Sequence, residues 1–522
     1  MAAGSLARCG RSDPAGNRNA TLALPGRENA RDSFARPVVT ASPRTIHLIA
    51  IGGTGMAPLA CLLQEQGHRV RGSDGPLYPP MSTLLEAAGI RPAVGYEPAH
   101  LRPRPDLAVV GNAVRRDNPE VLEAERLGVE RLSMPEALAR FFLADRKPLV
   151  VAGTHGKTTT TALAAWVYAR CGRDPGYLVG GVPVGLPASF RTGTGERFVI
   201  EGDEYNAAFF DRGAKFLHYR PETLILTSVE YDHADLYPSP EVLRSAYAQL
   251  IALLPATGRL IACGEDPELR ALAREAPCPV VLYGLGAGCD LAPIGGLGGI
   301  ETTAAGSRFR VRDPEIGEVE LAIRLAGEHN VLNALAVWAA ARRDDLPAAE
   351  VAAALASFAG VKRRLEEIGA VGRETEEITV VDDFAHHPTA VEKTLGGLAQ
   401  RYPGRRLVVL FEPRSLTAGR AFFYALYARA FGRAGRVLFA PTFHAGRLAD
   451  EERLDFSALA AELSAGGLQA TACASTAEVF STALAEARPG DVIVTMSSGA
   501  FEGLPHRLAA AFAERAETVG RP

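Results

Sequence analysis

The chain has 522 residues, enough for about three domains of ordinary size, and its 47% hydrophobic and 22% charged content is typical of a globular protein. A formal net charge of −4 gives no electrostatic reason to expect nucleic acid as a partner, and no apolar run approaches the ~18 residues of a membrane span, so no membrane is expected either. Seven scattered cysteines without a Cys-x-x-Cys pair are typical of reduced thiols in a cytoplasmic protein.

Residues 1–44 are rich in Arg, Ala, Gly, Ser and Pro and show no apolar periodicity. Such a composition cannot bury a core, so we expect a disordered extension, or a stretch translated from an upstream start codon. The segment also lacks the apolar centre of a signal peptide.

The first domain is predicted to begin with a buried strand at 46–51, followed by a glycine turn and a helix over about 57–66. A second strand ends at Asp74, which completes a βαβ unit of the Rossmann type and places an acid for a ribose or uridine contact. Another strand ends at Asn112, at the strand edge where phosphate and sugar contacts usually lie. The turn departs from Gly-x-Gly-x-x-Gly, which makes an NAD site the weaker alternative.

A phosphate-binding loop is predicted at 153–158, between a short apolar strand at 149–152 and a helix. Its backbone N–H groups would face the phosphates, Lys157 would supply positive charge, and Thr158 could offer its hydroxyl to Mg²⁺. Only two residues separate Gly153 from Gly156, where the common phosphate loop has four. The alternative is a glycine turn before an ordinary helix.

Two later strands, at 197–204 and 224–233, both end in acidic residues. Because parallel strands align their carboxyl ends, Glu201 and His233 could reach one Mg²⁺ beside Thr158. The alternative for each residue is a solvated strand end.

Two asparagines near the end of the central domain precede a second set of predicted strands. Asn330 and Asn333 lie one turn apart on a predicted helix, where they could contact a purine edge or, alternatively, cap the helix. The chain changes domain near 360–365, and alternating strands and helices then predict a second doubly wound domain. One of its strands ends at Asp383 and is followed by His386.

Six motifs occur in a characteristic order along the chain. They are Gly-Thr-His-Gly-Lys-Thr-Thr-Thr, Glu-x-Asp-Glu, Asp-His, Gly-x-His-Asn-x-x-Asn, Arg-Arg and Asp-Asp-x-Ala-His-His-Pro. Over about residues 45–515 the chain resembles the Mur ligases, the ATP-dependent amide-forming enzymes of peptidoglycan synthesis. The resemblance implies an α/β protein with a UDP-sugar-binding Rossmann-like domain at 45–146, a central P-loop-type ATPase domain at 147–359 and a Rossmann-like domain at 360–522.

The resemblance also implies roles for individual residues, with ATP and Mg²⁺ as cofactors. The implied catalytic residues are Lys157, Glu201 and His233, and the implied Mg²⁺ ligands are Thr158, Glu201 and His233. The implied ATP contacts are Gly153, Thr154, His155, Gly156, Lys157, Thr158, Asn330, Asn333, Arg364, Asp383 and His386. The implied UDP-sugar contacts are Gly52, Gly53, Thr54, Gly55, Met56, Ser73, Asp74 and Asn112.

Within the family, the segments 78–83, 204–219 and 412–415 resemble the member that joins L-alanyl-γ-D-glutamyl-meso-diaminopimelate, the murein tripeptide, to UDP-N-acetylmuramate. Tyr205, Phe209 and Arg414 would contact the peptide; packing between domains is the alternative for the aromatic residues. Asn206 and Leu416 depart from that member's usual pattern. The alternatives are the L-alanine-adding ligase and a non-catalytic nucleotide-binding regulator. We expect a monomer or weak homo-oligomer.

Overall fold

The computed structural model describes residues 42–372 and 377–519. The predicted disordered extension, apart from its last three residues, lies outside that range. Among the helices of the described residues, none combines the length and the apolar character needed to cross a membrane.

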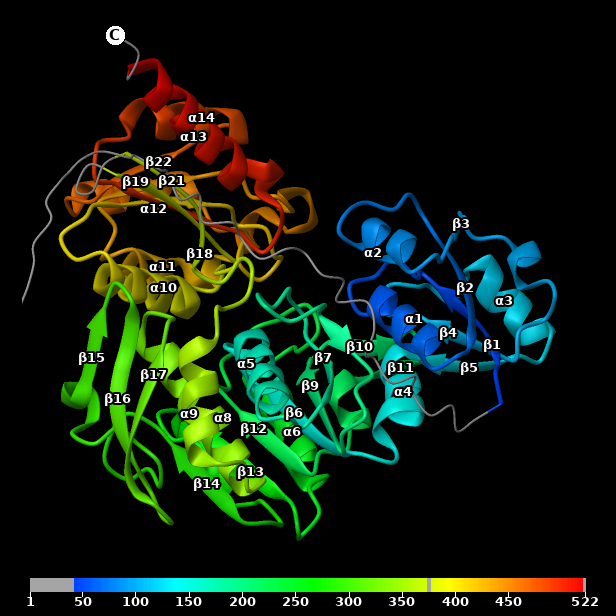
Figure 1. Ribbon diagram of the computed structural model, residues 1–522. Helices are drawn as coiled ribbons and strands as arrows, with labels where there is room; N and C mark the ends of the chain where they lie inside the picture. The colour runs from blue at the N-terminus through cyan, green and yellow to red at the C-terminus, as the bar shows by residue number, and fades with distance from the viewer. Residues whose placement is uncertain (1–41, 373–376, 520–522) are drawn as a thin grey trace, which may run out of the picture. The chain divides into compact units, whose positions relative to one another are not determined.

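The first domain is a five-stranded, wholly parallel sheet with strand order β3-β2-β1-β4-β5, which confirms the predicted Rossmann-like fold (Figure 1). The order reverses between β1 and β4, and such switch points carry ligand sites in open α/β sheets. Strand β1 ends two residues before the predicted limit because Ala50, with φ 65°, turns the chain out of the sheet. The elements are β1 (Thr45–Ile49), α1 (Met56–Glu65), β2 (Arg69–Asp74), α2 (Met81–Ala87), β3 (Ala93–Val94), β4 (Leu107–Val110), α3 (Pro119–Arg126), β5 (Glu130–Ser133) and α4 (Met134–Leu138).

The central domain is built on a seven-stranded sheet of order β14-β13-β12-β6-β9-β7-β8, in which only the edge strand β8 is antiparallel. Its central strand β6 (Lys147–Ala152) is fully buried from Leu149 to Ala152 and lies between β12 and β9. The remaining strands are β7 (Gly176–Leu178), β8 (Phe190–Arg191), β9 (Arg197–Gly202), β12 (Thr223–Leu226), β13 (Arg259–Cys263) and β14 (Val280–Tyr283). The helices are α5 (Lys157–Arg170), α6 (Pro240–Ala252), α7 (Pro267–Ala273), α8 (Glu328–Arg343) and α9 (Ala348–Ser357).

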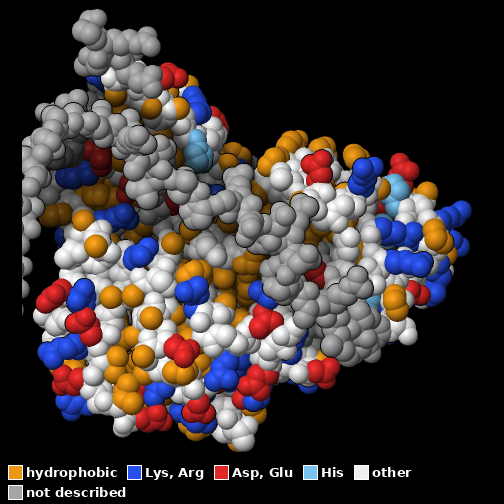
Figure 2. Space-filling model, in the orientation of Figure 1, with side chains coloured by type: hydrophobic (Ala, Val, Ile, Leu, Met, Phe, Trp, Pro, Cys, Tyr) orange, Lys and Arg blue, Asp and Glu red, His pale blue; other side chains and the backbone are white. Residues whose placement is uncertain are grey.

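Two small antiparallel sheets accompany the central one. They are the pair β10 (Asn206–Ala208) and β11 (Asp211–Ala214), and the sheet β15 (Ile300–Thr303), β16 (Gly306–Asp313) and β17 (Gly317–Ile323). Strands β16 and β17 carry opposite charges on their exposed face, with Arg308 bonded to Glu320 and Arg310 to Glu318. Figure 2 shows the same mixing of acidic and basic side chains over much of the visible surface.

The third domain is a six-stranded sheet of order β18-β19-β23-β20-β21-β22, in which only β18 is antiparallel to its neighbour. Its strands are β18 (Glu366–Val371), β19 (Ile378–Asp383), β20 (Leu407–Phe411), β21 (Arg436–Phe439), β22 (Gln469–Ala472) and β23 (Val492–Met496). Its helices are α10 (Pro388–Arg401), α11 (Tyr424–Ala430), α12 (Phe456–Ala465), α13 (Thr476–Glu486) and α14 (Leu504–Val519). The three-domain α/β organisation is therefore confirmed.

The chain passes from the central to the third domain over a few residues. Val361 still pairs with Pro183 of the central domain, whereas the Leu365 N–H already donates to Asp383 of the third. The predicted boundary at residue 360 stays a prediction with which these contacts agree.

The six cysteines in the described ranges are all free thiols. Four of them are buried, and Cys171 and Cys289 are partly exposed.

Candidate functional site

The phosphate loop depends on two glycines. Gly153 has φ 126°, and a Cβ there would lie 2.8 Å from the backbone nitrogen of Ser228, so only glycine fits. Gly156 has φ 82°, and a Cβ there would lie 2.9 Å from the Asn333 side-chain oxygen. Helix α5 begins directly after this turn, so its N-terminal N–H groups and dipole favour an anion at the loop.

The Lys157 side chain folds back onto the phosphate loop. Its ammonium donates to the carbonyl of Gly153 at 2.6 Å, to the carbonyl of Thr154 at 3.4 Å and to the carboxylate of Glu204 at 2.9 Å. Burial alone would lower the pKa of Lys157, but Glu204 and Asp203 outweigh it and raise the pKa above the usual value. The side chain is therefore a fixed positive charge at the phosphate loop.

Glu201 and Thr158 meet as predicted. The Thr158 hydroxyl donates to one Glu201 oxygen at 2.9 Å, and the backbone N–H of Gly180 donates to the other at 2.8 Å. A Cβ at Gly180 would lie 2.6 Å from Glu201, so this contact needs a glycine. From the start of the third domain, Arg364 donates to the same threonine hydroxyl at 3.4 Å.

His233 contacts a residue that the sequence reasoning left out of the site. Its Nε2 lies 3.2 Å from Glu204 Oε1, the same oxygen that accepts from Lys157. Burial opposes the charged ring, but Glu204 and Asp232 raise the pKa of His233 above its usual value. The ring also lies 4.4 Å, centre to centre, from Tyr205. The acid run Glu-Gly-Asp-Glu at the end of β9 was the available signal for Glu204.

The two predicted amides lie in the first turns of α8, which is capped by Gly327, so the helix-cap alternative is wrong. The Asn330 amide donates to the Ala326 carbonyl at 2.7 Å, and the Asn333 amide donates to the Asn330 oxygen at 3.2 Å. Asn333 faces Gly156, which brings this helix to the phosphate loop.

In the third domain, Asp383 accepts bonds from the Leu365 and Ala385 N–H groups and from the Thr394 hydroxyl. Burial nevertheless raises the pKa of Asp383. His386 contacts the Phe384 carbonyl at 3.0 Å, and burial lowers the pKa of His386.

The predicted UDP-sugar residues divide into two groups. Asp74 accepts bonds from the Gly52 N–H at 2.7 Å and from the Tyr96 hydroxyl at 3.0 Å, so strand end and glycine turn meet as predicted. Thr54 and Gly53 are exposed beside them, as is Asn112 beyond β4. By contrast, Met56 is buried in α1, and a Cβ on Gly55 would lie 2.4 Å from Met134.

Ser73 is fully buried, and its hydroxyl donates to Glu120 at 2.5 Å. Glu120 also lies 3.0 Å from His47 and 2.7 Å from His100, so it forms a closed polar hub inside the first domain. Sequence reasoning missed this hub because its members come from four separate segments.

The predicted peptide residues lie in different surroundings. Phe209 packs against the apolar cluster of the first domain that contains Ile49 and Val110, which is the interdomain packing of the alternative interpretation. Arg414 stacks on Phe443, with 3.8 Å from its guanidinium carbon to the ring centre, and lies 3.6 Å from Glu412.

Comparison with known proteins supports one assignment throughout. Family models match over residues 45–146 ("Mur ligase family, catalytic domain"), 151–341 ("Mur ligase middle domain") and 363–499 ("Mur ligase, glutamate ligase domain"). The Escherichia coli K12 protein named UDP-N-acetylmuramate–L-alanyl-gamma-D-glutamyl-meso-2,6-diaminoheptandioate ligase is 37% identical over 481 residues, which cover 91% of this chain and 99% of that protein.

Two further relatives are similarly close. The solved murein peptide ligase of Psychrobacter arcticus 273-4 shares 35% identity at a TM-score of 0.65, covering 90% of this chain and 99% of its own. The UDP-N-acetylmuramate–L-alanine ligase of Methylibium petroleiphilum is 34% identical over 469 residues, covering 89% of this chain and 97% of that protein. On the family models and on these near full-length identities, this chain belongs to the Mur ligase family.

Proposed function

We propose that this chain is an ATP-dependent ligase that joins L-alanyl-γ-D-glutamyl-meso-diaminopimelate to UDP-N-acetylmuramate. The observation that carries the proposal is the 37% identity, over nearly the whole chain, to a protein whose name states these substrates. The buried ammonium of Lys157 at a glycine loop supports the phosphoryl-transfer half of the reaction. We place the enzyme in the cytoplasm, as a monomer or weak homo-oligomer.

The reaction we propose has two steps. The γ-phosphoryl group of ATP passes to the lactyl carboxylate, which gives an acyl phosphate and ADP; the peptide amine then attacks the acyl carbon, and phosphate leaves. The first step concentrates negative charge at the loop, where Lys157 and the N-terminus of α5 stabilise it. Lys157 must exchange its bond to Glu204 for one to phosphate, while its ammonium can keep its bond to the carbonyl of Gly153.

The donor set beside Lys157 fits Mg²⁺. Thr158 and Glu201 present oxygen atoms 2.9 Å apart, and Glu204 Oε2 is buried without a hydrogen-bond partner among the described residues. Mg²⁺ held there would neutralise phosphate charge. The third predicted ligand, His233, contacts Glu204 rather than Glu201, so its part in holding the ion stays a prediction.

The remaining substrate contacts are proposed to be those that the family resemblance implies. Asn330, Asn333, Arg364, Asp383 and His386 would bind ATP; the turn at 52–56 with Asp74 and Asn112 would bind the UDP-sugar; and Arg414 would pair with a peptide carboxylate. Because an acyl phosphate hydrolyses in water, the contact of Arg364 with Thr158 suits a site that the third domain shields.

A second candidate is a UDP-N-acetylmuramate–L-alanine ligase, which the 34% identity to the Methylibium protein favours. Phosphate release from ATP in the presence of UDP-N-acetylmuramate distinguishes the two. We expect kcat/KM to be higher with tripeptide than with L-alanine as acceptor. The opposite order would favour the second candidate, and no release with either would contradict both.

A further inference from the structure

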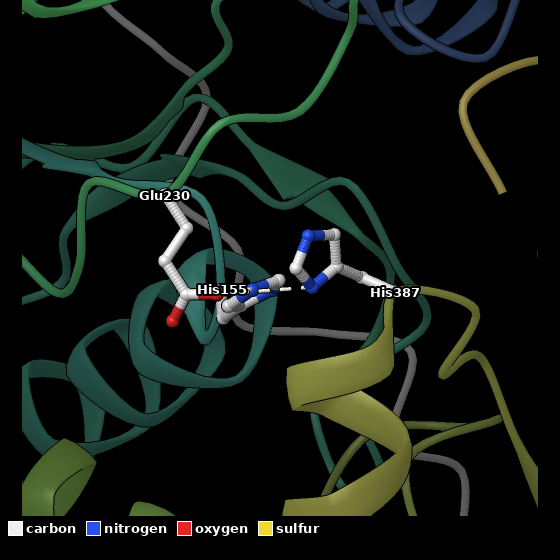
Figure 3. Close-up of side chains that lie close together, drawn as sticks. All are labelled: His155, Glu230 and His387. Carbon is white, nitrogen blue, oxygen red and sulfur yellow. Dashed lines mark hydrogen bonds and ion pairs between the residues drawn. The ribbon is translucent and has the colours of Figure 1, made fainter. Parts of the chain in front are cut away.

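Three side chains from separate segments converge beside the phosphate loop (Figure 3). His155 belongs to the loop, Glu230 follows β12, and His387 precedes α10 of the third domain. Glu230 Oε2 lies 3.4 Å from His155 Nε2 and 3.8 Å from His387 Nδ1. One potential ligand atom from each residue lies within 4.8 Å of the other two. The reaction proposed above gives no role to Glu230 or His387.

We propose that His155, Glu230 and His387 bind a divalent transition-metal ion of the Zn²⁺ class, which ties the phosphate loop to the third domain. Two imidazoles and one carboxylate are a common protein ligand set for Zn²⁺, with a fourth position open to water or another oxygen. Metal–ligand bonds of about 2.0–2.1 Å in tetrahedral geometry place ligand atoms about 3.3–3.5 Å apart. The two separations that involve Glu230, 3.4 and 3.8 Å, therefore need only small adjustments, and the ligand nitrogens of the two imidazoles lie within 4.8 Å of each other.

The hydrogen bond to His387 shows which ring nitrogen faces Glu230 and where the ring proton lies. The Thr389 N–H donates to His387 Nδ1 at 3.3 Å, so the ring proton lies on Nε2, and a metal ion at Nδ1 would replace this capping bond. Burial lowers the pKa of His387 to about 4, which keeps the ring neutral at pH 7. Nδ1 lies 3.8 Å from the Glu230 carboxylate, so a cation between them could bind both the nitrogen lone pair and the carboxylate oxygen.

The surroundings of Glu230 also favour metal binding, because they keep its carboxylate ionised and oriented. Burial would raise the pKa of Glu230, but hydrogen bonds from His155 and Thr389 outweigh it and bring the pKa to about 2. The Thr389 hydroxyl donates to Glu230 Oε2 at 2.6 Å and so orients the carboxylate, as partners outside a metal's own ligands usually do. Nearby Asp232 adds negative charge to the surroundings of His387.

The ligand types distinguish this site from the proposed Mg²⁺ site. Imidazole nitrogens favour Zn²⁺, Co²⁺ and Ni²⁺, whereas Mg²⁺ prefers oxygen ligands such as those of Thr158 and Glu201. A competing cluster exists in Glu136, Asp211 and His218, which offers one imidazole and two carboxylates and is less buried. That cluster supplies the matched control.

The test uses the full chain, stripped with a chelator and kept in excess Mg²⁺. Titration with Co²⁺ should give the visible absorption of a tetrahedral site, and calorimetry with Zn²⁺ should measure its affinity. His387→Asn removes the imidazole but keeps a side chain able to cap α10, and Glu230→Gln removes the charge at constant shape. Each variant should weaken Zn²⁺ binding by more than about 100-fold, since even changes outside the direct ligands cost about 10–100-fold. His218→Asn should leave it unchanged.

Melting temperature gives a second readout. Zn²⁺ should raise the melting temperature of the unaltered chain and of His218→Asn, and fail to raise that of His387→Asn. Circular dichroism of each variant without metal checks that it is folded. Equal Zn²⁺ affinity in the unaltered chain and His387→Asn would overturn the proposal, as would loss of binding in His218→Asn. Neither readout involves a substrate, so failure of the proposed ligase activity would not affect the test.

Discussion

Two cationic side chains proposed to bind substrate, Lys157 and Arg414, lie in opposite surroundings. Lys157 is 14% exposed, and three oxygen acceptors surround its ammonium. Arg414 is 29% exposed, lies on the face of Phe443 and has one loose ion pair, with Glu412 at 3.6 Å.

The difference shows two ways of presenting charge to a ligand. The Lys157 ammonium is positioned before ATP arrives. Because it is bonded to the carboxylate of Glu204, an incoming phosphate must displace that carboxylate. The Arg414 guanidinium is held by its flat face, which leaves its edge N–H groups able to form a paired contact with a carboxylate. We therefore expect Lys157 to act mainly on rate and Arg414 mainly on peptide affinity.

Replacing Lys157 should have the largest effect. Lys157→Ala should lower kcat by about 100- to 1,000-fold, as loss of one electrostatic stabiliser of a transition state typically does, while the fold is kept. Lys147→Ala is the matched control, because Lys147 forms an exposed pair with Glu196 at the other end of β6. Near-normal turnover in Lys157→Ala would remove the loop from the mechanism.

Replacing Arg414 should act on one substrate only. Arg414→Ala should raise KM for tripeptide by about 10- to 100-fold, since a charge-assisted hydrogen bond contributes about 1.5–3 kcal/mol, and should hardly change KM for ATP. Steady-state kinetics with each substrate varied in turn would measure this. Arg429, exposed on α11, provides a control, and an equal rise in both KM values would contradict the assignment.

Replacing Glu204 tests how the lysine is held. Glu204→Gln should lower the free energy of unfolding by about 1–3 kcal/mol, because Lys157 and His233 lose their shared charged acceptor. Both tryptophans, Trp166 and Trp338, lie in the central domain, so urea unfolding followed by tryptophan fluorescence reports on it.

The loss in Glu204→Gln should depend on pH with a defined sign. Glu204 helps to raise the pKa of His233, so the stability from the charged ring is complete below the ordinary pKa of about 6.5 and is lost as pH rises through the raised value. The deficit of the variant should consequently be larger at pH 6 than well above the raised pKa. A deficit that does not change with pH would show that His233 is not coupled to Glu204.

Removing residues 1–44 should have the smallest effect. A chain that begins at Thr45 should keep its melting temperature and activity, because the removed composition cannot bury a core. Among the described residues, the truncation removes two bonds of Arg44: its N–H donates to His68 at 3.2 Å, and its carbonyl accepts from the Arg69 N–H at 2.8 Å. A fall of many degrees in melting temperature would show that the extension packs on the body of the protein.

The sequence predicted what local patterns determine. A buried strand followed by glycines and Lys-Thr places Lys157 and Thr158, and the alignment of parallel strand ends brings Glu201 to them. The sequence did not predict that Glu204 would bridge Lys157 and His233. Three acids lie close together at the end of β9, and side-chain packing, not spacing, determines which of them forms this bridge.

Other parts were missed for related reasons. Strands β16 and β17 were not predicted; they pair with each other in an antiparallel sheet that lies outside the predicted alternation of strands and helices. Ser73 lies within the expected strand, yet its hydroxyl donates to Glu120, which lies 47 positions away in the chain. Contacts between distant segments leave no local trace in a single sequence.

The burial of the cysteines has a consequence for the redox behaviour of the protein. Burial raises the pKa of Cys61 and of Cys263 to about 11, and it raises the pKa of the other four described thiols as well. At neutral pH these six thiols carry very little thiolate, and thiolate is the nucleophile that attacks disulfides and peroxides. These six described thiols should therefore survive an oxidative episode that would modify a more acidic cysteine.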